Sequence, residues 1–211
     1  MNLRLVRLWL AGLAIGAVIF GGAALYINRQ SINFSQEQST SLPNLGGPFS
    51  LIDQFGKTRT DVEFRGKYML VYFGYTFCPD VCPLGLRNIS SAIDLLGRDI
   101  DQVVPIFITI DPERDTPESL NSYASTVHSS FVFLTGTQNQ LDPVIKFYNV
   151  YAAKARPDGT IADYVMDHSS LVYLMSREGK LIDFFPHTED PKKIADRISR
   201  FLVKDIKKAK A

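Results

Sequence analysis

The sequence predicts an α/β domain in which a central mixed sheet is flanked by helices, preceded by an N-terminal transmembrane helix. Three observations lead to this prediction. An uncharged apolar run lies near the N-terminus, strand-like and helix-like segments alternate after it, and a strand–turn–strand unit followed by a helix ends the chain. The length of 211 residues suits one globular domain with an appendage, because a domain usually holds roughly 100 to 200 residues.

Residues 8–27 form the predicted transmembrane anchor. Their sequence, LWLAGLAIGAVIFGGAALYI, carries no charge and matches the roughly 20 apolar residues that a helix needs to cross a bilayer. Arg4 and Arg7 precede the run and only Arg29 follows it closely, so residues 1–7 are expected to stay in the cytoplasm while the rest is exported. Small residues near the end of the run leave a cleaved signal peptide as the alternative, and the domain is exported in either case.

Three further regions follow the anchor. Residues 28–47 are rich in Ser, Gln, Asn and Gly and contain Pro43, which predicts a mobile tether. Residues 48–205 are expected to form the globular α/β domain. The Lys-rich residues 206–211 are expected to be a solvated tail that touches anionic lipid at most weakly.

The first half of the domain alternates strands and helices. A hairpin is expected to open it, with strands at residues 49–53 and 57–61 on either side of a Gln-Phe-Gly turn. The units after it are a strand at 68–73, a helix at 84–96, a strand at 103–110, a helix at 117–127, a strand at 131–134 and a helix at 139–148. Such alternation implies parallel pairing of the strands.

The second half closes the domain with a hairpin and a helix. Strands are expected at residues 164–165, 171–175 and 181–185. A Ser-Arg-Glu-Gly turn joins the last two as an antiparallel hairpin. The final helix is expected to begin at Asp190-Pro191, where Asp can cap and Pro suits the first position, and to end near Lys204. This order of elements is that of a thioredoxin-like fold.

Charge and cysteine content narrow the function. The chain has 23 Lys and Arg against 22 Asp and Glu. This near balance gives no indication of a nucleic-acid partner, which would favour an excess of positive charge. Its only cysteines, Cys78 and Cys82, are too few for a disulfide framework. A close pair in a chain of this size indicates redox or metal chemistry.

The cysteine pair lies in a loop at the carboxyl end of the first core strand, where open α/β sheets place their sites. Each cysteine precedes a proline, which favours extended geometry and stiffens the loop. Pro83 suits the first position of the following helix, so we expect Cys82 to lie beside free backbone N–H groups. That position favours the thiolate.

Two thiolates can form a disulfide, exchange with other thiols or bind a metal, and a third donor would decide among these. Two sulfurs with one imidazole suit Cu(I) and can also hold Cu(II), whereas structural zinc usually takes four protein ligands. In a thioredoxin-like fold the loop that carries His168, just before the strand at 171–175, faces the cysteine loop. The other two histidines remain alternatives: His128 at the end of a helix and His187 after a strand.

Three motifs together resemble the SCO/SenC family. They are YTFCPDVCP at residues 75–83, DPERDTP at residues 111–117 and Asp167-His168. The similarity extends over roughly residues 42–202 and shows no departure at these positions. The cysteine motif combined with a distant Asp-His before a strand is specific, whereas either alone is common.

The resemblance implies a membrane-anchored copper chaperone with Cys78, Cys82 and His168 as ligands of Cu(I) or Cu(II). Its expected partners are subunit II of cytochrome c oxidase or another copper client, and a thioredoxin-like reductant. It would deliver copper to the CuA site of that subunit or reduce the cysteines of that site. The expected location is the inner membrane, single-pass, with the soluble domain on the periplasmic or mitochondrial intermembrane-space side.

Acidic residues near these motifs are expected to support the site rather than bind the metal. Asp115 or Thr116 is predicted to cap the helix that follows. Asp142 is likewise predicted to cap its own helix. Asp80 and Asp167 can orient the histidine or tune the thiolates.

Three competing functions follow from the same residues. A metal-free thiol-disulfide oxidoreductase would use Cys78 and Cys82 and would leave His168 dispensable. Peroxiredoxins commonly place Thr three residues before the reactive Cys, but Tyr75 stands there and Thr76 is one residue too late. A binding module with a structural disulfide would leave the proline-framed loop unexplained.

Overall fold

The computed structural model describes residues 44–156 and 164–209, with side chains up to residue 205. The predicted cytoplasmic segment 1–7, the anchor 8–27 and most of the tether lie outside these residues. Within the described ranges, no helix combines the length and apolar character needed to cross a membrane.

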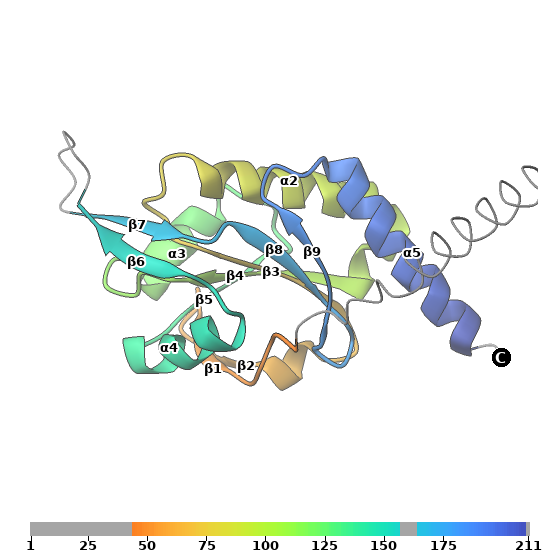
Figure 1. Ribbon diagram of the computed structural model, residues 1–211, viewed down its shortest axis with the longest axis horizontal. Coiled ribbons are helices and arrows are strands. Elements are labelled where there is room, and N and C mark those ends of the chain that lie inside the picture. Colours follow the sequence, from red (N-terminus) through yellow and green to blue (C-terminus); the bar gives the residue numbers. More distant parts are fainter. Residues whose placement is uncertain (1–43, 157–163, 210–211) are drawn as a thin grey trace, which may run out of the picture. The chain divides into compact units, whose positions relative to one another are not determined.

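A seven-stranded mixed sheet forms the centre of the domain, with strand order β2-β1-β5-β4-β3-β8-β9 (Figure 1). Its strands are β1 (Ser50–Asp53), β2 (Thr58–Thr60), β3 (Tyr68–Gly74), β4 (Val103–Thr109), β5 (Val132–Thr135), β8 (Leu171–Met175) and β9 (Leu181–Pro186). The pairs β3/β4 and β4/β5 are parallel, and all other pairs in this sheet are antiparallel. The predicted mixed sheet is confirmed.

Helices cover both faces of this sheet. They are α2 (Val81–Leu95), α3 (Pro117–Ala124), α4 (Gln138–Phe147) and α5 (Pro191–Ala209), with short 3₁₀ turns η1 (Asp61–Phe64) and η2 (Gly97–Gln102). Helices α2 and α5 lie in contact on one side of the sheet, and α4 lies on the other (Figure 1). Every residue of β3 is buried, because the strand lies between β4 and β8 and beneath helices on both faces.

Successive residues of β3 face opposite sides, as a strand requires. The Tyr72 ring packs against Phe107, and its edge lies beside Gly85 of α2. The Phe73 ring packs instead against Tyr148, which follows α4, at 5.1 Å between centroids. The continuous apolar run that predicted a buried strand therefore reflects two separate apolar layers.

The first residues of α3 confirm a predicted helix cap, whereas those of α4 show that another predicted cap is wrong. Thr116 caps α3 by accepting a hydrogen bond from a backbone N–H at 3.3 Å, with proline at the next position, as predicted. Thr137 caps α4, and Gln140 completes a capping box. Asp142 therefore lies inside the helix, where it accepts a hydrogen bond from Gln138 at 2.6 Å. The predicted capping role of Asp142 is wrong because Thr137 occupies that position.

A second, two-stranded sheet was not predicted in full. It pairs β6 (Ala152–Ala155) with β7 (Val165–His168), antiparallel. The sequence predicted only a short strand at 164–165 because the AAKA sequence of β6 lacks the β-branched and aromatic residues typical of strands. Helix α5 also extends past the predicted end at Lys204, so the Lys-rich tail predicted at 206–211 begins within a helix.

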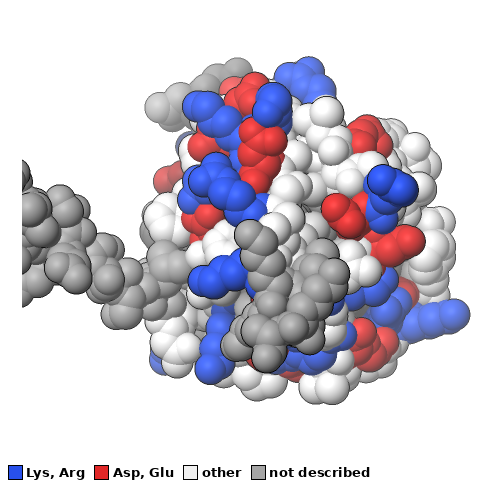
Figure 2. All heavy atoms as spheres, turned by 90° about the vertical axis from the view of Figure 1, so that its right-hand side faces the viewer, with Lys and Arg blue, Asp and Glu red and all other residues white. Residues whose placement is uncertain are grey.

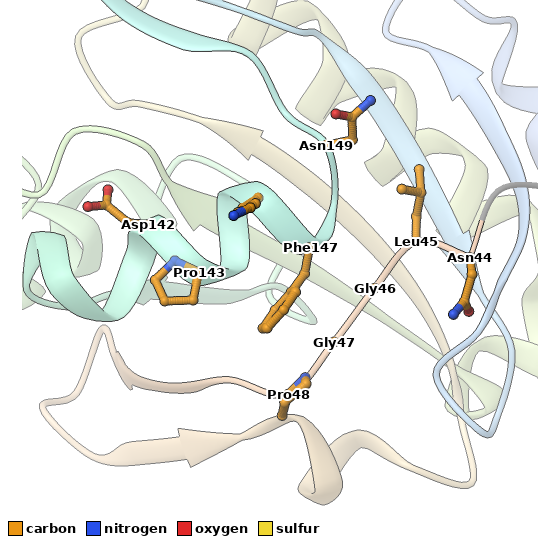
Figure 3. A pocket seen from close by; sticks show the side chains of 10 residues that line it. Asn44, Leu45, Gly46, Gly47, Pro48, Asp142, Pro143, Phe147 and Asn149 are labelled. Atoms are coloured by element: carbon orange, nitrogen blue, oxygen red, sulfur yellow. The ribbon is translucent and has the colours of Figure 1, made fainter.

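The last residues of the predicted tether are packed onto the domain (Figure 3). Gly46 donates a backbone hydrogen bond to the Phe147 carbonyl at 2.9 Å and has φ +100°. A Cβ at Gly46 would lie 2.5 Å from the end of Met175, and one at Gly47 would lie 2.6 Å from the Phe147 ring. Gly46 and Gly47 are therefore in close contact with the domain, on the N-terminal side of the boundary expected at residue 48.

Charges of both signs are interleaved on the side of the molecule where α5 lies (Figure 2). Three ion pairs hold basic residues of this helix: Lys192–Asp196 at 2.7 Å, Lys193–Glu189 at 3.6 Å and Arg197–Asp183. Exposed pairs of this kind contribute little to stability. Each of these basic residues is therefore paired with an acidic neighbour.

Replacing Ile198 of α5 with alanine is expected to destabilise the domain. Ile198 is fully buried and α5 contacts α2, so the free energy of unfolding should fall by about 2 to 5 kcal/mol in equilibrium urea unfolding. Val203→Ala is the matched control, because Val203 lies on the same helix but is 50% exposed. Its effect should stay within about 0.5 kcal/mol. Equal losses for the two variants would contradict the packing of α5.

Candidate metal centre

The two cysteines lie where β3 ends and α2 begins. Cys78 is in the connecting loop, and Cys82 is the second residue of α2. The helix starts at Val81, before the predicted range 84–96, so Pro83 is its third residue rather than its first. Proline is tolerated in the first turn of a helix because the N–H groups there have no partner within the helix.

Asp115 anchors the start of the cysteine loop. Its buried carboxylate accepts hydrogen bonds from the backbone N–H of Thr76 at 3.1 Å and from the Thr76 hydroxyl at 2.5 Å. It also accepts one from the Thr109 hydroxyl at 2.6 Å, which ties the loop to the end of β4. Burial raises the pKa of this carboxyl. Asp115 thus supports the loop instead of capping α3.

Gly74, the last residue of β3, makes room for the Cys82 sulfur. A Cβ at this position would lie 2.7 Å from the Cys82 Sγ and 3.0 Å from the Phe107 ring. Cys82 is fully buried, and Cys78 is 7% exposed. Gly74 was not among the residues predicted for the site, although a glycine at the end of a buried strand is a signal of close approach.

His168 supplies an imidazole from the end of β7. Its Nε2 lies 3.6 Å from the Cys82 Sγ. Its Nδ1 lies 2.9 Å from the Ser169 carbonyl, so Nδ1–H donates to that oxygen and Nε2 faces the thiols. The Tyr75 ring contacts the imidazole edge to face, at 5.9 Å and 83°. The orientation of the ring is thus set by Ser169 and Tyr75.

The predicted carboxylate partners of His168 do not take that role. Asp167 is its neighbour in the same strand, so it points to the opposite face, and it is exposed. Asp80 is exposed at the start of α2 and its side chain forms no capping bond. Asp80 contributes through its backbone, not its side chain, because a hydrogen bond from its N–H lowers the pKa of Cys78.

The structure brings the three predicted ligands together. The donor atoms of Cys78, Cys82 and His168 all lie within 4.8 Å of one another. His128 is outside this group and bonds to a serine and an aspartate. His187 follows β9, and its carbonyl accepts a hydrogen bond from α2. Among the described residues, this group is the one with metal-binding geometry.

The two thiols differ strongly in acidity. The pKa of Cys78 falls to about 4, chiefly because the Cys82 thiol donates a hydrogen bond to its sulfur, with burial opposing and His168 and backbone N–H groups assisting. The pKa of Cys82 is raised by that same bond and by burial. The Cys82 backbone N–H also points at the Cys78 Sγ, at 3.4 Å.

This asymmetry corrects the sequence-based expectation of a thiolate at Cys82. The first turn of α2 does favour a thiolate, but its N–H groups point back to the sulfur of Cys78 in the preceding loop. The arrangement therefore holds one thiolate and one thiol, with an imidazole nitrogen beside them.

Two sulfurs and one nitrogen facing a common point suit a soft ion such as Cu(I). A closed structural zinc site would take four protein ligands, and this group has three. These observations define a thioredoxin-like domain with a thiolate–imidazole centre suited to copper. The sequence model of the SCO1/SenC family matches residues 37–203. The chain belongs to the SCO1/SenC family.

Individual relatives agree with this assignment. The SCO2-like protein RP587 of Rickettsia prowazekii is 40% identical over 141 residues, which cover 67% of this chain and 69% of that protein. The mitochondrial SCO1 homolog of Homo sapiens is 34% identical over 190 residues, 88% of this chain and 63% of that protein. The match thus spans less than two thirds of the human relative.

A solved structure shows the same fold. Copper-bound ScoI of Bradyrhizobium japonicum is 43% identical, with a TM-score of 0.68, and the match covers 74% of this chain and 98% of that one. Because nearly all of that solved chain is covered, it corresponds as a unit to the described domain.

The thiolate at Cys78 can be observed by ultraviolet absorbance. In the reduced, metal-free protein we expect the absorbance of one thiolate at neutral pH, lost as the pH falls through about 4. Cys78→Ser should remove this signal, whereas Cys82→Ala should keep a thiolate with a higher pKa, because the alanine side chain cannot donate the main hydrogen bond to Cys78. A signal that titrates near the ordinary thiol pKa in the wild type would contradict the asymmetry.

The same shift makes stability depend on pH. An unfolded chain protonates Cys78 below the ordinary pKa of 9.0, whereas the folded protein keeps the thiolate down to about 4. The stabilisation is therefore present above about pH 9 and is lost as the pH falls to about 4. Between these two pH values Cys82 stays largely protonated in both the folded and the unfolded chain. The difference in pH-dependent stability between the wild type and Cys78→Ser therefore measures the contribution of Cys78.

Proposed function

We propose that this chain binds one copper ion through Cys78, Cys82 and His168. The observation that carries the proposal is the convergence of these three donor atoms within 4.8 Å, with Nε2 of His168 already turned toward the sulfurs. The copper in ScoI of Bradyrhizobium japonicum, at 43% identity, supports copper as the ion. Loading displaces the remaining proton of Cys82, because the metal ligand is the thiolate.

We further propose that copper is cargo, delivered to the CuA site of cytochrome c oxidase subunit II or to another copper client. Membership of the family supports this role. Three donors hold the ion without enclosing it, so a client with more or softer donors can take it by successive ligand exchange. The neighbouring Phe77 is 60% exposed, which places the cysteine loop at the surface where a client can reach it.

The proposed location is the inner membrane, with the domain on the periplasmic or mitochondrial intermembrane-space side. The uncharged run at 8–27 and the arginines before it support a single-pass anchor. The mitochondrial SCO1 homolog of Homo sapiens is consistent with such a compartment. Residues 28–43 would then serve as the tether that lets the domain reach a membrane-bound client.

The asymmetric thiols favour a second candidate function, which is reduction of a client disulfide. The Cys78 thiolate attacks one sulfur of the client disulfide, forming a mixed disulfide and releasing the other sulfur as a thiolate that takes a proton. Cys82 loses its proton and attacks Cys78, which releases the second client thiol and leaves a Cys78–Cys82 disulfide. Two electrons pass to the client, and a thioredoxin-like reductant must restore them.

Copper titration of the reduced full-length protein in detergent separates the two candidates. The wild type is expected to retain one copper per chain, and Cys78→Ala and Cys82→Ala to lose it. His168→Ala should bind more weakly, because the imidazole completes the donor set. His128→Ala is the matched control and should bind like the wild type. A His168→Ala variant with wild-type affinity would support the metal-free function instead.

Oxidation before loading should abolish copper uptake. A Cys78–Cys82 disulfide leaves neither sulfur as a thiolate ligand. The measurement is bound copper after oxidant treatment and desalting, with a sample reduced again before loading as the control that restores uptake. Undiminished copper uptake by protein whose thiols are shown to be fully oxidised would contradict the proposed three-ligand site.

A further inference from the structure

Arg114 lies at the meeting point of the cysteine loop and the hairpin that carries His168. It belongs to the segment between β4 and α3. Its guanidinium carbon is 3.8 Å from the centroid of the Tyr164 ring, 4.9 Å from that of Phe77 and 5.5 Å from that of Tyr75. Phe77 and Tyr75 belong to the cysteine loop, and Tyr164 immediately precedes β7.

Hydrogen bonds hold this cation in place. Its Nε forms an ion pair with Asp111, which is 1% exposed, and its Nη1 donates to the Tyr164 carbonyl at 3.1 Å. The Tyr164 hydroxyl donates to the same Asp111 carboxylate at 2.8 Å. Nη2 is buried without a hydrogen-bond partner in the described part of the chain. A planar guanidinium can stack and donate in this way, whereas a lysine cannot.

The hairpin depends on such contacts for its position. Strands β6 and β7 pair only with each other and are not hydrogen-bonded into the seven-stranded sheet. Tyr164 leads directly into Val165–His168, so fixing Tyr164 fixes the start of β7. On β6, Lys154 forms an ion pair with Glu113 at 2.6 Å, which adds an exposed contact between the same two segments.

The aromatic contacts continue from Arg114 to the donor group. The Tyr75 ring lies beside Arg114 on one side and meets the imidazole of His168 edge to face at 5.9 Å on the other. The Tyr75 carbonyl also accepts the backbone N–H of Cys78 at 3.2 Å. Arg114 is therefore in contact with both segments that must meet to form the site.

We propose that Arg114 is a positioning residue that fastens the β6–β7 hairpin to the cysteine loop, so that Nε2 of His168 faces the two sulfurs. Arg114 is not a ligand, and it acts through His168. Its effect on copper rests on the proposed function, whereas its effect on the hairpin is independent of copper.

The test compares Arg114→Gln with Arg59→Gln in the full-length protein. Arg59 is a matched control: its guanidinium lies 5.2 Å from the Phe64 ring and pairs with the buried Asp53 at 3.4 Å, on the edge strand β2. Competition with a copper(I) chelator should show roughly 10- to 100-fold weaker binding for Arg114→Gln, the usual cost of removing a residue that orients a ligand. Arg59→Gln should bind like the wild type; equal affinities for both variants would overturn the proposal.

A double variant shows whether Arg114 acts through the histidine. In the His168→Ala background, Arg114→Gln should cause no further loss of affinity, because the group it positions is absent. A second loss of the same size in that background would overturn the positioning role and assign Arg114 to the cysteine loop alone.

Hydrogen exchange of the metal-free protein supplies a readout that does not depend on copper. The amides of Ala152–Ala155 and Val165–His168 should exchange faster in Arg114→Gln than in Arg59→Gln, while those of β3 stay protected. If the wild type bound no copper, the proposed function would fail and this comparison alone would decide the positioning role. Unchanged exchange in the hairpin would overturn it.

Discussion

Cys82 is buried in the first turn of α2, and its sulfur packs against the backbone of Gly74 at the end of β3. The other features of the site depend on this contact. With Cys82 held there, its backbone N–H and its thiol both point toward Cys78, which makes Cys78 the thiolate. His168 then approaches the same buried sulfur from the hairpin. Moving Cys82 would disturb both of its neighbours in the site.

Holding a thiolate and a thiol side by side has a functional consequence. A single charge is easier to keep in a buried site than two, because each additional buried charge must be desolvated. A copper ion supplies the positive charge that allows the second sulfur to lose its proton. The same difference in acidity makes Cys78 the attacking sulfur in disulfide exchange, so one geometry serves both proposed reactions.

Much of this arrangement follows from local sequence. Buried strands, the hairpin at the end and the Thr116 cap each depend on residues near in the chain, and the structure agrees with them. The cysteine loop was placed correctly because a loop after a core strand occupies a known edge of the sheet. The start of α4 is also visible in the sequence, because Thr137 and Gln140 have the spacing of a capping box, which places Asp142 inside the helix.

Other features could not be predicted because distant residues determine them. Strand β6 has no strand-like sequence, and contacts such as the pair between Lys154 and Glu113 connect it to the rest of the domain. The thiolate at Cys78 depends chiefly on a hydrogen bond from the Cys82 thiol, with backbone N–H groups assisting, and the spacing of the cysteines does not give these directions. The orientation of the imidazole by the Ser169 carbonyl likewise required its final position.

The central claim is that both sulfurs and the imidazole bind the same ion. X-ray absorption spectroscopy of the reduced, copper(I)-loaded protein tests it most directly, because it identifies the atoms bound to the metal. The account predicts two sulfur neighbours and one nitrogen neighbour, with the nitrogen contribution lost in His168→Ala. A wild-type spectrum with sulfur neighbours alone, unchanged in His168→Ala, would contradict it.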